Sequence, residues 1–341
     1  MKRLLIGYLL LLLLGRSVVF GEDPAPADRA SPQESAPREV NERQTPLNFH
    51  GPSRDGDQVW LIDTRNLAEL VEDAARLVAS LYGENGKWKE TRLEALFDPV
   101  APNVTTVFFL HGYGSSPDDA EHVGWAMYHA LADKMETEEH LRYVIWSWPS
   151  AETRLRLATD MREKARRTNT EAVYLAWLLA RIPDDSRVTL IGYSFGARIV
   201  TGALHLSAED PPKLRPAERQ TASRPAVRAV LITPALHSHW LEPGKYHAGA
   251  LARVDHMLVT YNVGDPALTD YGRLWNSSHP AALGTKGIAS LEKLGALAER
   301  VTQIDVAPSI GNHHGIGHYL RAEKVMERVR ALAVWRGEKL D

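Results

Sequence analysis

Seven short runs of apolar, largely β-branched residues recur along the chain, and longer stretches with helical spacing separate most of them. Strands that alternate with helices favour a parallel sheet, because each helix crosses over the sheet and returns the chain to the start of the next strand. Several runs are apolar at consecutive positions, as expected of strands buried on both faces. The predicted strands are residues 58–62, 105–110, 143–148, 187–191, 226–232, 257–262 and 301–306. We therefore expect an α/β fold: a doubly wound, mostly parallel sheet with helices on both faces, in a single domain.

The stretches between these runs place apolar residues three and four positions apart, which is the spacing of one helix face. The basic cluster Arg162–Arg167 lies in such a pattern, and we interpret it as a solvated helix face. The predicted helices are residues 67–81, about 118–135, 171–182, 197–206 and about 319 onwards.

The N-terminus has the pattern of a signal peptide. Lys2 and Arg3 precede an apolar run from Leu4 to Leu14. This run is short for a membrane span, although Val18–Phe20 extend it, so an uncleaved N-terminal anchor is the alternative. In either case we expect residues 1–21 to direct export, which would make the protein periplasmic, extracellular or membrane-tethered.

The next segment, residues 22–56, is rich in Pro, Ala, Glu, Arg and Ser and holds few large apolar side chains. Such a composition cannot bury a core, so it predicts a disordered linker. The remaining residues 57–341 are enough for one large α/β domain with a substantial core, and too few for two.

The amino-acid composition excludes several classes of function. The chain contains no cysteine, so disulfides, thiolate metal sites and a cysteine nucleophile are impossible. The formal net charge is −3, with acidic and basic residues interspersed, so no long-range field favours nucleic acid as a partner. A small or neutral substrate matches this charge pattern better than nucleic acid does.

The sequence Gly192-Tyr193-Ser194-Phe195-Gly196 follows one predicted strand directly and precedes a predicted helix directly. A Gly-x-Ser-x-Gly segment in this position is typical of a nucleophile elbow, a sharp turn that holds the serine hydroxyl out at the edge of the sheet. Glycines on either side relieve crowding between the turn and its neighbours. Ser194 is therefore the predicted nucleophile.

An earlier loop, His111-Gly112-Tyr113-Gly114, follows the strand at residues 105–110. An acyl-transfer enzyme must stabilise a tetrahedral oxyanion, and one N–H donor normally comes from such an early loop and the other from the residue after the nucleophile. We assign these donors to Tyr113 and Phe195. His111, beside the glycine turn, is expected to orient the loop and not to act as the base.

The acid of a serine triad on this type of sheet comes after the nucleophile and before the histidine. Asp265 follows the strand at residues 257–262, at the carboxyl edge where catalytic groups gather. Its alternative role is an ordinary turn-forming Asp before proline. Asp270 is the second candidate for the acid.

The base is expected after the last predicted strand, in the segment Asn312-His313-His314-Gly315-Ile316-Gly317-His318. A proton-shuttling histidine must reach over the sheet from a loop, which favours the positions before the glycines. We assign the base to His314, with His313 and His318 as alternatives. In the resulting triad Asp265 would fix the imidazole tautomer, and His314 would take the Ser194 proton.

These residues resemble the α/β-hydrolase superfamily, and within it the bacterial proteins described as alpha/beta hydrolases of unknown function. The resemblance spans most of the predicted domain, and its markers are Phe109–Gly114, Trp146–Ser150, Gly192–Gly196 and Tyr261–Asp265. It implies that residues 57–341 form an α/β-hydrolase domain with a catalytic triad, but it does not imply a substrate. We expect an esterase-like or lipase-like serine hydrolase with a small-molecule ester or acyl substrate and no cofactor. Hydrolysis and acyl transfer to an alcohol use the same residues, so both stay open.

Two other functions compete with this one. The chain could be a non-catalytic binding module that retains a hydrolase fold. It could also be a metal-dependent hydrolase with a histidine cluster, although glycines interrupt the histidine segment and no metal site is predicted. The residues of that cluster would be His313, His314 and His318, joined by His237 and His239.

Overall fold

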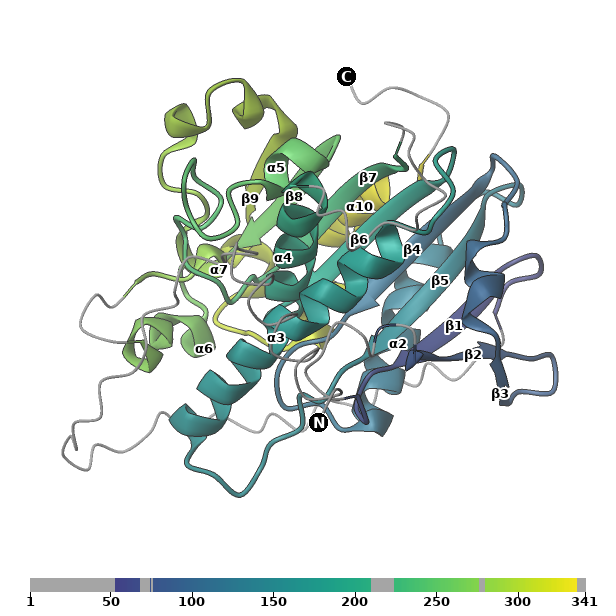
Figure 1. Cartoon of the computed structure of the whole chain (residues 1–341). Helices are drawn as coiled ribbons and strands as arrows, with labels where there is room; N and C mark the ends of the chain where they lie inside the picture. The colour runs from purple at the N-terminus through teal and green to yellow at the C-terminus, as the bar shows by residue number, and fades with distance from the viewer. Residues whose placement is uncertain (1–52, 68–73, 75, 210–223, 276–279, 336–341) are drawn as a thin grey trace, which may run out of the picture.

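The computed structural model describes residues 53–67, 74, 76–209, 224–275 and 280–335. Within these residues nine strands form one sheet in the order β3-β2-β1-β5-β4-β6-β7-β8-β9 (Figure 1). All seven predicted strands are present. Their bounds, with the two further strands, are β1 (Gln58–Asp63), β2 (Val78–Tyr82), β3 (Trp88–Thr91), β4 (Val104–Leu110), β5 (His140–Ser147), β6 (Arg187–Tyr193), β7 (Ala226–Ile232), β8 (His256–Tyr261) and β9 (Val301–Asp305).

The sheet is mostly parallel. Six consecutive pairings, from β1·β5 to β8·β9, are parallel, and only β2 and β3 run antiparallel to their neighbours. The carboxyl ends of the parallel strands therefore meet at one edge of the sheet. Loops that follow β4, β6, β8 and β9 are brought together there, although they lie far apart in the sequence.

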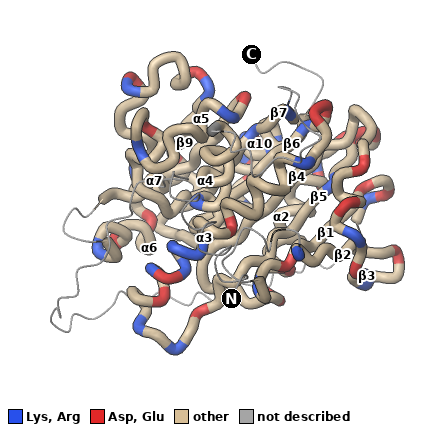
Figure 2. The backbone as a smooth tube through the Cα atoms, viewed as in Figure 1, with Lys and Arg blue, Asp and Glu red and all other residues tan. Residues whose placement is uncertain are grey.

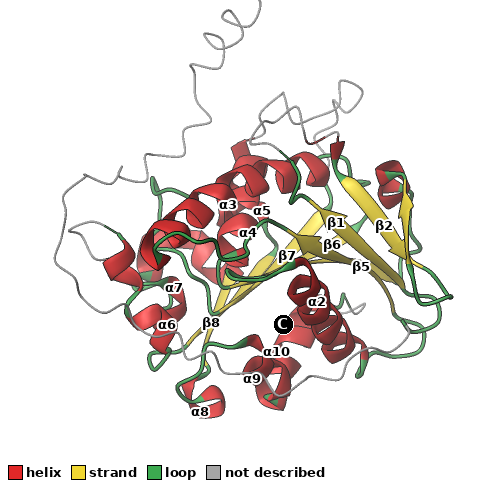
Figure 3. Cartoon of the chain, turned by 90° about the horizontal axis from the view of Figure 1, so that it is seen from below, coloured by secondary structure: helices red, strands yellow, loops and turns green. Residues whose placement is uncertain are grey.

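Helices cover both faces of this sheet, as Figure 3 shows. Side chains of β4 alternate between two buried cores, with Phe108 on one side and Phe109 on the other. This arrangement confirms the predicted fold class. One face carries α3 (Leu157–Leu179), α4 (Gly196–Glu209), α5 (Ala250–Arg253) and α7 (Leu283–Lys286), and the other carries α2 (Pro117–Ala132), α9 (Ile316–Arg321) and α10 (Glu323–Ala333).

Short helices complete the loops: α6 (Pro266–Thr269), α8 (Ala307–Ile310) and the 3-10 helices η2 (Leu93–Phe97), η3 (Tyr271–Leu274) and η4 (Leu291–Arg300). Acidic and basic residues are interspersed along the backbone, as Figure 2 shows. No helix in the described ranges has both the length and the apolar character to cross a membrane. The predicted export signal and residues 22–52 of the predicted linker lie outside the described residues.

The predicted helix over residues 67–81 is wrong, because its last part is strand β2. Backbone groups of β2 pair antiparallel with β1 on one side and with β3 on the other. The helical spacing of apolar residues in this stretch is therefore overridden by strand pairing. The overlooked signal was the turn between β2 and β3, where Asn85 precedes Gly86 and Gly86 has a φ of +72°. Residues 68–73 and 75 lie outside the described part of the chain.

The interpretation of Arg162–Arg167 as a solvated face is wrong at Arg167, which is 7% exposed. Its guanidinium donates to the Glu171 carboxylate one helical turn later, at 2.9 Å. Glu171 is fully buried and also accepts hydrogen bonds from the Thr64 hydroxyl and the Trp146 indole. The cluster therefore includes one arginine on the sheet-facing side of α3, where it compensates a buried carboxylate.

We expect Arg167→Met to lower the free energy of unfolding by about 3–5 kcal/mol at neutral pH, because it leaves the Glu171 charge buried without its cation. Burial already raises the pKa of Glu171, and removal of the nearby positive charge raises it further. The deficit should therefore shrink as the pH falls and Glu171 takes up a proton. Urea unfolding at two pH values measures this. The exposed neighbour Arg166 provides the control, since Arg166→Met should change stability by less than about 0.5 kcal/mol; equal losses in both variants would contradict the assignment.

Candidate active site

The predicted elbow is present between β6 and α4. Ser194 has a φ of +50°, a left-handed conformation that is strained for a residue with a side chain. Backbone hydrogen bonds hold it there: the Ser194 N–H donates to the Ile232 carbonyl at 3.0 Å. A side chain at Gly196 would collide with the Leu110 carbonyl at the end of β4, and one at Gly192 would collide with the start of α4. Both glycines are therefore required for the turn.

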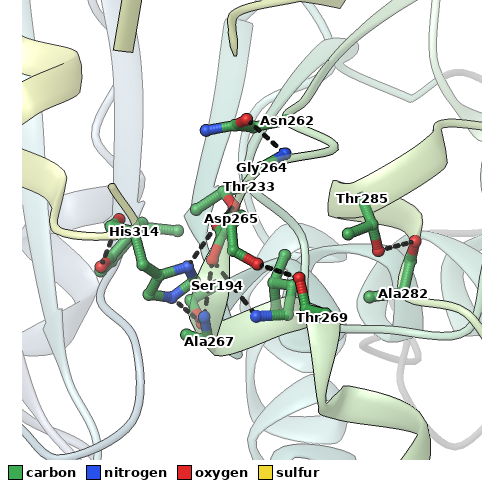
Figure 4. A network of polar contacts seen from close by, with 12 residues as sticks. Ser194, Thr233, Asn262, Gly264, Asp265, Ala267, Thr269, Ala282, Thr285 and His314 are labelled. Carbon is green, nitrogen blue, oxygen red and sulfur yellow. Dashed lines mark hydrogen bonds and ion pairs between the residues drawn. The ribbon is translucent and has the colours of Figure 1, made fainter. Parts of the chain in front are cut away.

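The structure brings together the three residues assigned to the triad (Figure 4). The Ser194 Oγ lies 3.1 Å from Nε2 of His314, and Nδ1 of His314 lies 2.7 Å from Oδ2 of Asp265. An ionised carboxylate only accepts hydrogen bonds, so Nδ1 carries the proton and Nε2 accepts from the serine hydroxyl. Asp265 is fully buried, whereas the His314 side chain is 20% exposed. The arrangement can withdraw a proton from Ser194.

Asp265 combines both roles that were considered for it. Its Oδ1 caps helix α6 by accepting from the backbone N–H groups of Ala267 and Leu268, at 3.0 and 3.2 Å. Its Oδ2 accepts from His314 and from the Thr233 hydroxyl, at 2.7 Å each. Each carboxylate oxygen therefore has two donors, and the carboxylate is fixed in rotation (Figure 4).

Two residues that support this carboxylate were not predicted. Thr233, directly after β7, has a φ of +42°, which is unusual for a β-branched residue, and its N–H donates to the Thr260 hydroxyl. Asn262 accepts from the Gly264 N–H at 3.0 Å and donates to the Gly311 carbonyl at 2.7 Å. Asn262 thus joins the loop of the acid to the loop of the histidine. No local sequence pattern marks Thr233. Asn262 belongs to the segment Tyr261–Asp265, which carries the family resemblance, but the sequence pattern assigns it no role.

The alternative acid, Asp270, and the alternative bases, His313 and His318, have other contacts than those of the triad. Asp270 forms an ion pair with Arg273 at 3.0 Å. His313 and His318 stack on each other, with ring centroids 3.9 Å apart and planes at 4°. Within the described ranges, no three His, Cys, Asp or Glu side chains are arranged to hold a metal ion.

The loop assigned to the oxyanion runs beside the nucleophile, since a Cβ on Gly112 would lie 3.2 Å from Cβ of Ser194. Tyr113 and Phe195 follow Gly112 and Ser194 in sequence, and their rings meet edge to face at 5.9 Å. The two assigned donors therefore belong to two segments that lie next to each other, Gly112–Tyr113 and Ser194–Phe195.

His111 lies beneath this loop and is fully buried. Burial lowers the pKa of His111 to about 3, so the imidazole is neutral. Its Nε2 accepts from the Trp148 N–H at 3.3 Å, which leaves the proton on Nδ1 to be donated to the Gly112 carbonyl at 2.9 Å. These contacts suit a residue that orients the loop and leave no free nitrogen for a base.

One family model matches the central part of the chain. A family model described as alpha/beta hydrolase of unknown function matches residues 94–239. No curated protein matches the sequence significantly. Similar solved structures include the product of lin2722 from Listeria innocua, at 10% identity and a TM-score of 0.39, which covers 67% of this chain and 93% of that one.

Two further similar structures are enzymes. Esterase B from Lactobacillus rhamnosis, inhibited by a tributyrin phosphonate, has 11% identity and a TM-score of 0.37, with 82% of this chain and 85% of that one covered. Acyl-protein thioesterase 2 from Zea mays has 16% identity and a TM-score of 0.35, with 68% and 95% covered. The family match contains both the early loop and the elbow, and the nine-stranded sheet positions them at one edge. The central part of the chain, residues 94–239, thus matches a family described as alpha/beta hydrolase of unknown function, and the described residues form one mostly parallel, nine-stranded sheet with helices on both faces.

Proposed function

We propose that this chain is a serine hydrolase that cleaves a carboxylic ester through an acyl-enzyme on Ser194. The observation that carries the proposal is the continuous chain of hydrogen bonds from Ser194 through His314 to Asp265. A serine on a strained elbow, with its Oγ 3.1 Å from Nε2 of a histidine, is the arrangement that activates a hydroxyl for attack.

In the first half of the reaction the Ser194 oxygen attacks the ester carbonyl while His314 Nε2 takes its proton. The carbonyl oxygen becomes an oxyanion, which the N–H groups of Tyr113 and Phe195 would stabilise. The tetrahedral intermediate then expels the alcohol, and His314 returns the proton to that leaving oxygen. The product of this half is an ester between Ser194 and the acyl group.

In the second half a water molecule attacks the acyl-enzyme, and His314 takes one of its protons. Collapse of the second tetrahedral intermediate releases the carboxylic acid and returns the proton to Ser194. Asp265 stabilises the imidazolium in both halves through its bond to Nδ1, without accepting the proton itself. An alcohol in place of the water would give acyl transfer with the same residues.

A fluorophosphonate probe tests this proposal, because it forms a stable adduct only with an activated serine. We expect the folded protein to gain the mass of one probe, and peptide mapping to locate that mass on Ser194. Protein unfolded in urea is the control and should stay unlabelled. A folded protein that does not react, or reacts at another residue, would contradict the triad and favour a binding role for the fold.

A further inference from the structure

The side chain of Tyr113 reaches a buried carboxylate that the proposed chemistry does not use. Its phenol donates a hydrogen bond of 2.6 Å to Oδ2 of Asp160, 47 residues further along the chain. Asp160 is 1% exposed and lies in the first turn of α3. A short bond from a phenol to an ionised acceptor is among the stronger hydrogen bonds in proteins.

The Asp160 carboxylate also accepts hydrogen bonds from a second loop, the one that follows β5. The Thr153 hydroxyl donates to Oδ1 at 2.7 Å, and the Thr153 N–H approaches Oδ2 at 3.4 Å. The first turn of a helix is also where the helix dipole favours a negative charge. Asp160 therefore joins the loop after β4, the loop after β5 and the start of α3.

The Tyr113 residue that carries the assigned oxyanion donor is held both through its backbone and through its side chain. The Tyr113 N–H belongs to the same planar peptide as the Gly112 carbonyl. His111 Nδ1 donates to that carbonyl at 2.9 Å, and the Gly114 N–H donates to the Ser150 carbonyl at 2.8 Å. The backbone is thus held on both sides of Tyr113, and the bond to Asp160 holds its side chain.

We propose that Asp160 is a positioning residue of the oxyanion site: through the Tyr113 phenol it fixes the direction of the Tyr113 N–H. This inference rests on the proposed function. The competing role of Asp160 is purely structural, as a buried carboxylate that stabilises the beginning of α3. The two roles differ in their effect on kcat and KM. An oxyanion donor stabilises the tetrahedral state much more than the bound ester, so its loss lowers kcat and hardly changes KM.

The test uses Tyr113→Phe and Asp160→Asn in the full chain, singly and together, with an ester substrate. Removal of a whole oxyanion donor typically lowers kcat by 10²–10³-fold, so a loosened donor is expected to lower it by about 10-fold. KM should stay within about twofold, since the bound ester does not use the donor fully. The double variant should be no slower than the slower single variant, because both changes break the same bond.

Tyr143→Phe is the matched control. Tyr143 is a fully buried tyrosine on β5, and its phenol donates to the Gly124 carbonyl at 2.9 Å. Loss of this bond should lower the midpoint of thermal unfolding and leave kcat unchanged. A structural role for Asp160 would make Asp160→Asn behave like this control.

The possible outcomes distinguish a failure of this inference from a failure of the proposed function. An active wild type whose kcat is unchanged by Tyr113→Phe would overturn the role of Asp160 alone. So would a loss of kcat from Asp160→Asn that is equally large in the Tyr113→Phe background. A wild-type protein that neither hydrolyses esters nor reacts with a fluorophosphonate would overturn both the function and the inference.

Discussion

His314→Ala is expected to lower kcat for ester hydrolysis by about 10⁶-fold, since loss of the base of a serine triad costs about as much as loss of the whole triad. The reason is geometric: Nε2 of His314 lies 3.1 Å from the Ser194 Oγ. Without this acceptor the hydroxyl keeps its proton and attacks as a neutral alcohol. Steady-state kinetics with an activated ester, together with the rate of fluorophosphonate labelling, measure the effect.

The chain supplies two matched controls for this prediction. His313 and His318 lie within five residues of His314 and are similarly half-buried, yet they stack on each other. His313→Ala and His318→Ala should therefore keep kcat within about threefold of the wild type. The assignment fails if either control loses activity as completely as His314→Ala while its thermal unfolding is unchanged, because that histidine would then be the base.

The parts of the site that could be predicted from sequence are those encoded by local pattern. A strand, a Gly-x-Ser-x-Gly turn and a helix are contiguous at Ser194, so their conformation follows from neighbouring residues. Asp265 and His314 could be assigned because each follows the carboxyl end of a parallel strand, and the topology brings such ends together. The glycines that interrupt the segment favoured His313 or His314 over His318, but they did not distinguish His313 from His314.

What could not be predicted depends on contacts between distant segments. Strand β2 was missed because its apolar residues also fit a helical period, and only pairing with β1 decides between helix and strand. Arg167 was placed in solvent because the burial of its partner Glu171, which also accepts from Thr64 and Trp146, arises only in the folded protein. Asp160 was not recognised for the same reason, since its bond to Tyr113 joins two separate loops.

Asp265→Asn is expected to lower kcat by about 10⁴-fold, the cost of the wrong histidine tautomer in a serine triad. The hydrogen bonds around the carboxylate dictate this result. Oδ1 accepts from two backbone N–H groups in the cap of α6, so an amide nitrogen cannot occupy that position. The amide nitrogen must take the place of Oδ2 and donate to Nδ1 of His314. The proton of the imidazole then moves to Nε2, which can no longer accept from Ser194.

The stability of the same variant separates this tautomer effect from unfolding. The asparagine oxygen keeps the cap of α6, so the free energy of unfolding should change by no more than about 1 kcal/mol. Asp270→Asn is the control, because Asp270 pairs with Arg273 on the exposed side of the loop, and it should keep nearly full activity. An Asp265→Asn protein that is folded and retains more than about a tenth of the wild-type kcat would show that Asp265 caps its helix and does not direct His314.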